Sequence, residues 1–150
     1  MRYLGSKIKL LSSIEAVIEE NGIQGETFAD LFAGTGVVGD YFKNKYKIIS
    51  NDFLYYAYVI NKAKLENSGV PKFDNFVKSK KEDIFVWLNN LSFHPDDTYF
   101  VYNNYTPKGG RMFFSESNGI KIDGLRLIIE ELYRDGLVNN AEYYILIASL

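Results

Sequence analysis

The chain has 150 residues, with 17 Lys+Arg against 19 Asp+Glu, a single His and no Cys. Because there is no cysteine, a disulfide scaffold, a cysteine-ligated zinc site, an iron–sulfur cluster and a thiol nucleophile are all excluded. The net charge of −2 gives no overall attraction to nucleic acid, so any contact with DNA must come from a local basic patch. The hydrophobic share of 47% is that of a folded protein, no apolar run is long enough to span a membrane, and we expect a cytoplasmic location.

The first half of the chain alternates between helical and strand patterns. The predicted elements are a helix over 6–20, a strand over 27–32, a helix over 37–45, a strand over 47–52 and a helix over 54–67. Strands that alternate with helices in this way are typical of a parallel sheet. The fold class predicted for this half is therefore α/β.

The second half is less regular. We expect a helix over 73–91, a strand over 99–102, a polar loop or hairpin over 103–118, and helices over 122–134 and 141–150. The last apolar run stops at Leu150 with no glycine, basic turn or polar tail. Two interpretations stay open: the chain is a fragment, or Leu150 packs against something else.

A glycine-rich turn follows the first predicted strand. Gly34, Gly36 and Gly39 fit the spacing of the dinucleotide fingerprint, which is weak evidence when it stands alone. The pyrophosphate of a dinucleotide would be repelled by Asp30 at the strand end, whereas the cationic S-adenosylmethionine (SAM) would be attracted. Asp52, after the second strand, can accept hydrogen bonds from two ribose hydroxyls of either cofactor. The turn favours SAM and leaves an NAD-binding Rossmann domain as an alternative.

Several segments, in order, resemble the Dam-like (alpha-type) class of SAM-dependent adenine-specific (N-6) DNA methyltransferases. The opening motifs are RYLGSK at 2–7, DLFAGTG at 30–36 and Asn51-Asp52, and later matches lie at 114–126 and 142–150. The resemblance implies part of a Rossmann-like SAM-dependent methyltransferase fold. It also implies methyl transfer from SAM to the adenine amino group of double-stranded DNA, in a restriction-modification system. Methylation of the cytosine amino group or of RNA remains an alternative.

The resemblance also implies which residues bind SAM. Tyr3, Gly5 and Lys7 would border the pocket near the methionine end, and Asp52 would bind the ribose hydroxyls. Phe53 would either lie near the adenine or pack in the core. The residues expected to line the methionine and ribose are Asp30, Phe32, Gly34 and Gly36.

The catalytic motif of the class, Asp-Pro-Pro-Tyr, does not occur in the chain. The run at 103–107, NNYTP, resembles it but has the wrong order. We therefore expect 1–70 to be the SAM-binding portion and 71–150 to begin the target-recognition region, with a helix that returns to the core. The catalytic strand would follow Leu150, so the chain alone would be inactive. A truncated or split subunit, with a partner chain that supplies the catalytic half, is the non-enzymatic alternative.

A basic turn with aromatic neighbours is the predicted DNA contact. Lys108 and Arg111 flank two glycines and precede Met112-Phe113-Phe114, so this turn could touch phosphates and reach a groove. Other lysine clusters have acids nearby and are expected to be solvated. The lone His94 is expected to be a polar surface residue, and methyl transfer requires no metal.

Overall fold

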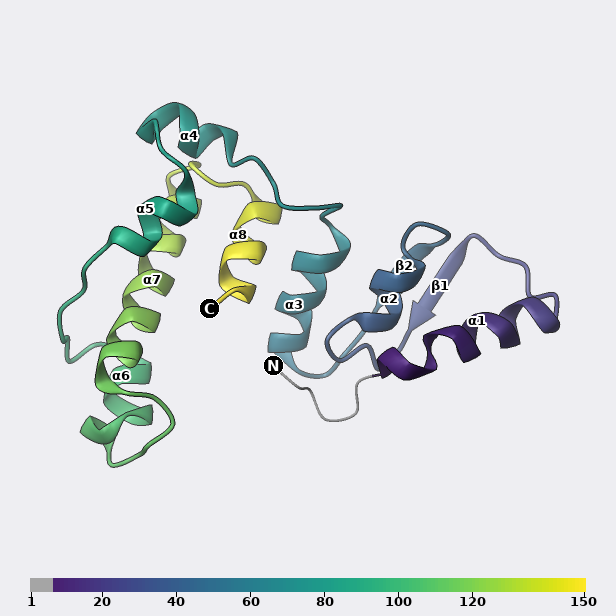
Figure 1. Cartoon of the computed structure of the whole chain (residues 1–150), viewed down its shortest axis with the longest axis horizontal. Helices are drawn as coiled ribbons and strands as arrows, with labels where there is room; N and C mark the ends of the chain where they lie inside the picture. The colour runs from purple at the N-terminus through teal and green to yellow at the C-terminus, as the bar shows by residue number, and fades with distance from the viewer. Residues whose placement is uncertain (1–6) are drawn as a thin grey trace. The chain divides into compact units, whose positions relative to one another are not determined.

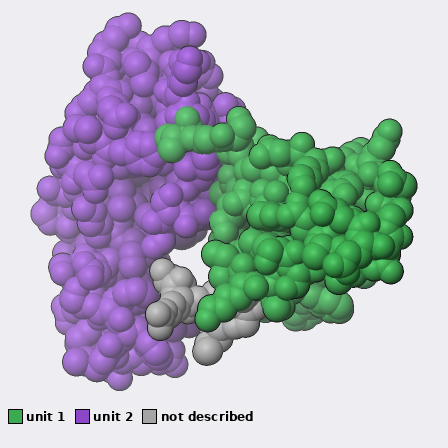
Figure 2. All heavy atoms as spheres, turned by 45° about the vertical axis from the view of Figure 1, so that its right-hand side comes forward, with its two compact units in different colours: residues 1–70 green, residues 71–150 purple. Residues whose placement is uncertain are grey.

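The computed structural model describes residues 7–150 and contains two compact units, Met1–Val70 and Pro71–Leu150 (Figure 2). Figure 1 labels their helices and strands. Among the described residues, no helix combines the length and the apolar character needed to cross a membrane.

Unit 1 is built on two parallel strands. Strand β1 (Thr27–Asp30) pairs with β2 (Lys47–Ser50), so that Thr27 lies opposite Lys47 and Asp30 opposite Ser50. The remaining elements are η1 (Lys7–Leu10), α1 (Leu11–Glu20), α2 (Val37–Phe42) between the strands, and α3 (Tyr55–Leu65) after β2. The predicted alternation of helix and strand and the parallel pairing are confirmed. Parallel pairing brings the carboxyl ends of both strands to one edge of the sheet.

Close packing holds α2 against the sheet. The rings of Phe28 and Phe42 stack with their centroids 4.8 Å apart, and Phe42 is fully buried. A Cβ at position 39 would lie 3.1 Å from the Ile48 side chain, so Gly39 permits α2 to approach β2 closely. The turn that precedes α2 is thereby held at the end of β1.

Unit 2 is helical throughout its described elements. They are α4 (Asp74–Lys80), α5 (Ile84–Asn90), α6 (Phe100–Tyr105), η2 (Pro107–Gly109), α7 (Glu116–Arg134) and α8 (Asn140–Ala148). Helices α4, α5, α7 and α8 meet in one apolar core, formed by Phe73, Phe76, Ile84, Leu88, Ile129, Leu132, Val138 and Leu146.

Two predicted elements of unit 2 are wrong, and the loop expected over 103–118 is shorter than predicted, because α6 ends at Tyr105 and α7 begins at Glu116. The helix expected over 73–91 is divided at Lys81, whose φ of 58° lies in the left-handed region, and Asp83 caps a new helix by accepting from the amides of Phe85 and Val86. The strand expected over 99–102 is the start of α6, because the buried carboxylate of Asp123 accepts a hydrogen bond from the Tyr102 amide at 2.8 Å.

Candidate cofactor-binding site

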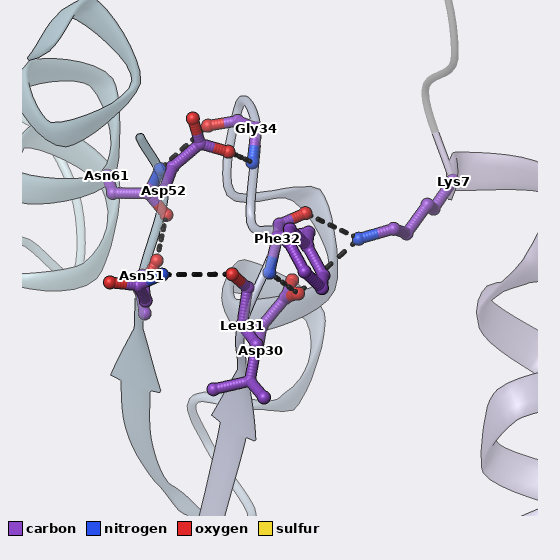
Figure 3. Close-up of polar contacts among 9 residues, drawn as sticks. Lys7, Asp30, Leu31, Phe32, Gly34, Asn51, Asp52 and Asn61 are labelled. Atoms are coloured by element: carbon purple, nitrogen blue, oxygen red, sulfur yellow. Dashed lines mark hydrogen bonds and ion pairs between the residues drawn. The ribbon is translucent and has the colours of Figure 1, made fainter. Parts of the chain in front are cut away.

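The end of β1 carries a buried acid that is only partly satisfied. Asp30 is 8% exposed, and its Oδ1 accepts a hydrogen bond from the Phe32 amide at 3.3 Å. The Lys7 ammonium lies 3.4 Å from the same oxygen and donates to the Phe32 carbonyl at 2.7 Å (Figure 3). Within residues 7–150, Oδ2 of Asp30 is buried and has no hydrogen-bond partner. Since an unpaired buried carboxylate oxygen is costly, this position suits a cationic ligand or an N–H donor.

Asp52 follows β2 and is held by backbone amides. Its Oδ1 accepts from the Leu54 amide at 3.0 Å and its Oδ2 from the Gly34 amide at 2.8 Å. These hydrogen bonds lower the pKa of Asp52 below its ordinary value of 3.8, and the bond from the Leu54 amide has the largest effect. Because the folded-state pKa is lowered, the stabilisation from this carboxylate is present above about pH 4 and is lost as the pH falls through the folded pKa. Asp52 is therefore charged at neutral pH.

Asn51 joins the two strand ends. Its amide donates to the Asp30 carbonyl at 2.9 Å, its carbonyl accepts from the Ala33 amide at 2.9 Å, and its side chain donates to the Leu31 carbonyl at 3.0 Å. The segments that carry Asp30 and Asp52 are thus fastened to each other at one edge of the sheet (Figure 3).

The glycine turn is held by Asn61, which sequence reasoning missed. Asn61 lies in α3 and is 6% exposed, and its amide donates to the carbonyls of Gly34 at 2.8 Å and Ala57 at 2.7 Å. Gly36 has a φ of 71°, and a Cβ there would lie 2.4 Å from Oδ1 of Asn61. A polar residue one helical turn after Ala57, in a helix that packs on a sheet, was the available signal in the sequence.

Two aromatic rings are exposed just after the strands. Phe32 is 81% exposed and Phe53 is 98% exposed. The alternative that Phe53 packs in the core is therefore wrong for the described structure. An exposed ring beside Asp52 is free to stack on a flat ligand.

An open pocket of about 480 Å³ runs along β2 and α3. Ser50, Asn51, Asp52, Tyr58 and Asn61 lie in its wall, whereas Asp30 and the glycine turn do not. Of the predicted cofactor residues that lie within 7–150, the wall of this pocket therefore contains Asp52 alone.

The structure brings the predicted cofactor residues together in two groups. Lys7, Asp30 and Phe32 contact one another, and Gly34 contacts Asp52. Tyr3 and Gly5 lie outside the described residues.

The predicted DNA contact is a turn of unit 2 whose two basic side chains lie over aromatic rings. The Arg111 guanidinium lies 5.3 Å from the Tyr105 ring centroid, and the Lys108 ammonium lies 5.7 Å from that of Tyr102. The backbone is fixed because the Arg111 amide donates to the Thr106 carbonyl at 3.1 Å. Segment 98–115 contains two cations and no acid, so this turn is locally positive in a chain of net charge −2.

The run that resembles the catalytic motif gains no support as a site. The NNYTP run at 103–107 ends helix α6 and begins η2, and its buried Thr106 hydroxyl donates to the Tyr102 carbonyl at 2.6 Å. In the described part of the chain, no group of three or more His, Asp or Glu side chains could hold a metal ion.

Comparison with known proteins identifies relatives along the whole chain. The family model of the D12 class N6 adenine-specific DNA methyltransferases matches residues 3–150. The chain is 57% identical to modification methylase LlaI of Lactococcus lactis subsp. lactis and 40% identical to type II methyltransferase M.FokI of Planomicrobium okeanokoites. All of the chain is covered in both matches, but only 24% of each relative.

The chain covers a larger share of a third relative. The chain is 35% identical to type II methyltransferase M.NlaIII of Neisseria lactamica, over all of its own length and 44% of the relative. No solved structure gives a significant match. The resemblance noted in the motifs is confirmed, and the chain belongs to the D12 class N6 adenine-specific DNA methyltransferases.

Proposed function

We propose that the chain is the SAM-binding part of a site-specific DNA adenine (N-6) methyltransferase of a restriction-modification system. The observation that carries the proposal is the buried Asp30, whose Oδ2 has no partner among residues 7–150. The segment that carries Asp30 is also hydrogen-bonded to the segment that carries Asp52. SAM carries an ammonium group and ribose hydroxyls, which match these two carboxylates. The pyrophosphate of NAD would instead meet the buried charge of Asp30.

Different residues of unit 1 would bind different parts of the cofactor. SAM supplies a methyl group activated by its sulfonium. Asp30 would hold the ammonium, Lys7 the carboxylate of the methionine end, and Asp52 the ribose hydroxyls. The exposed rings of Phe32 and Phe53 would cover the ligand, and Gly34 and Gly36 would let the backbone approach it. Tyr3 and Gly5 remain proposed neighbours of the methionine end.

The sheet supports the idea of a partial Rossmann-like fold. Parallel sheets are normally covered on both faces, yet Ile49 of β2 is 52% exposed in the described structure. We propose that further strands and the catalytic Asp-Pro-Pro-Tyr motif come from another segment of a longer enzyme or from a partner chain. The 150 residues alone would then transfer no methyl group to DNA, which incubation with labelled SAM and DNA would test.

We expect Asp52→Ala to weaken SAM binding by about 10- to 100-fold, because it removes a charged hydrogen-bond acceptor. Isothermal titration calorimetry of the chain with SAM measures this effect. Asp97→Ala, in an exposed loop of unit 2, is the matched control and should bind like the unaltered chain. Absence of heat with the unaltered chain, or binding by Asp52→Ala equal to it, would refute the proposal. Titration with reduced nicotinamide cofactor tests the NAD alternative.

DNA binding is proposed for the basic turn of unit 2, where Lys108 and Arg111 would contact phosphates. We expect Arg111→Ala to weaken duplex DNA binding several-fold and to reduce the slope of log K against log salt by about one. Fluorescence anisotropy at several salt concentrations gives the slope, and Arg134→Ala in the last turn of α7 is the control. An unchanged slope would argue against this contact. Nucleoside analysis of methylated product from a complete enzyme would separate adenine from cytosine, and DNA from RNA.

A further inference from the structure

We infer that Asn61 is a positioning residue that sets the glycine turn and the Asp52 carboxylate for the cofactor. The inference rests on the proposed SAM site, and it assigns a role to a side chain that lies behind that site. Asn61 belongs to α3, whereas the groups it holds belong to the turn after β1 and to the end of β2.

Asn61 connects three segments through one buried amide. Its Nδ2 donates to the Gly34 carbonyl at 2.8 Å and to the Ala57 carbonyl of its own helix at 2.7 Å. Its Oδ1 accepts from the Ser50 hydroxyl at 2.7 Å, two residues before Asp52. Both donor hydrogens of the amide and its acceptor are therefore used, which fixes its orientation.

Gly34 transmits this orientation to Asp52. The carbonyl of Gly34 accepts from Asn61, and its amide donates to Oδ2 of Asp52, each at 2.8 Å. The residue is therefore held on both sides. Without the Asn61 amide, the Gly34 carbonyl would lose this partner, the turn could rotate, and the amide that aligns the Asp52 carboxylate would move with it.

The fit between Asn61 and the turn is also steric. A Cβ at Gly36 would lie 2.4 Å from Oδ1 and 3.0 Å from Cγ of Asn61. The Asn61 side chain thus occupies the space that a side chain in the turn would need. Hydrogen bonds and close packing together define one conformation for residues 34–36.

The test is a double-mutant cycle on SAM affinity, measured by calorimetry with the whole chain. We expect Asn61→Ser to weaken SAM binding about tenfold in the unaltered background. In the Asp52→Asn background the same change should weaken binding by less than about threefold, because its effect passes through Asp52. A merely structural role would give the same factor in both backgrounds.

Two further variants keep the test decisive. Asn89→Ser removes the same type of bond, from Asn89 Nδ2 to the carbonyl four residues before it at 2.9 Å, but in unit 2, and should leave affinity unchanged. If Asn61→Ser does not fold, Ser50→Ala removes only the bond to Oδ1, and its loss of about threefold should also disappear in the Asp52→Asn background.

The outcomes separate this inference from the proposed function. Binding by the unaltered chain, with equal factors in the two backgrounds or with no effect of Asn61→Ser, overturns the positioning role alone. Absence of SAM binding by the unaltered chain overturns the proposed function, and the inference with it. A shift of the Gly34 and Leu54 amide resonances in ligand-free Asn61→Ser supports the pathway through the turn.

Discussion

Asp30→Asn is expected to weaken SAM binding by about 10- to 100-fold while the free energy of unfolding changes by less than about 1 kcal/mol, or rises. The affinity falls because the charge that attracts the ammonium is lost, and hydrogen bonds to charged groups contribute about 1.5–3 kcal/mol. The stability is maintained because the folded chain no longer buries a carboxylate oxygen that lacks a partner among residues 7–150. The ion pair with Lys7 is long, at 3.4 Å and partly exposed, so its loss costs little.

Calorimetry with SAM and urea denaturation followed by circular dichroism measure the two sides of this expectation. Asp40→Asn is the matched control, because Asp40 is a half-exposed acid of the same unit that pairs with Lys43 at 2.8 Å. It should change neither quantity strongly. A loss of stability for Asp30→Asn that equals its loss of affinity would show that Asp30 serves folding rather than binding.

Gly36→Ala is expected to destabilise the chain by about 2–4 kcal/mol. Two costs combine in this variant: a left-handed φ of 71° in a residue with a Cβ, and a clash with Oδ1 of Asn61 at 2.4 Å. Gly22 separates the costs, because its φ is 59° and a Cβ added there would meet nothing within 4 Å. Gly22→Ala should therefore lose only about 1 kcal/mol.

Urea denaturation of both variants gives the comparison. Adding Asn61→Ser to Gly36→Ala should recover part of the loss, because the clashing atom is removed, although the φ strain remains. Equal destabilisation at positions 36 and 22 would contradict the assigned steric role of Asn61.

The sequence was sufficient to predict the order of strands and helices over 27–67 and their parallel pairing in unit 1. Residues 27–67 alternate between short apolar runs and helical spacing, and the acids Asp30 and Asp52 come where the strands end. Local patterns of this kind are reliable when each segment agrees with its tertiary setting. Asn61 could not be assigned in the same way, because its role depends on bonds to Gly34 and Ser50, which are 27 and 11 residues away.

Unit 2 shows where local patterns fail. Aromatic and β-branched residues over 99–102 favour a strand, yet the bond from the Tyr102 amide to Asp123 and the close approach of α7 at Gly119 accompany a helix there. The continuous helical pattern over 73–91 hides a break at Lys81, where no glycine or proline marks the left-handed conformation. The error over 99–102 thus reflects long-range contacts that propensity does not contain, whereas the break at Lys81 is followed by a new helix with a local cap, Asp83.

The two-stranded sheet affects how the isolated chain behaves in solution. Within residues 7–150, β1 and β2 pair only with each other, so each strand keeps one edge that no other described strand covers. An open parallel edge is a template for any extended segment that meets it, including the same strand of a second copy. The exposed Phe32 and Phe53 at the strand ends add apolar surface to such an encounter. We therefore expect the isolated chain to self-associate more as its concentration rises, and dilution to favour the separate molecule.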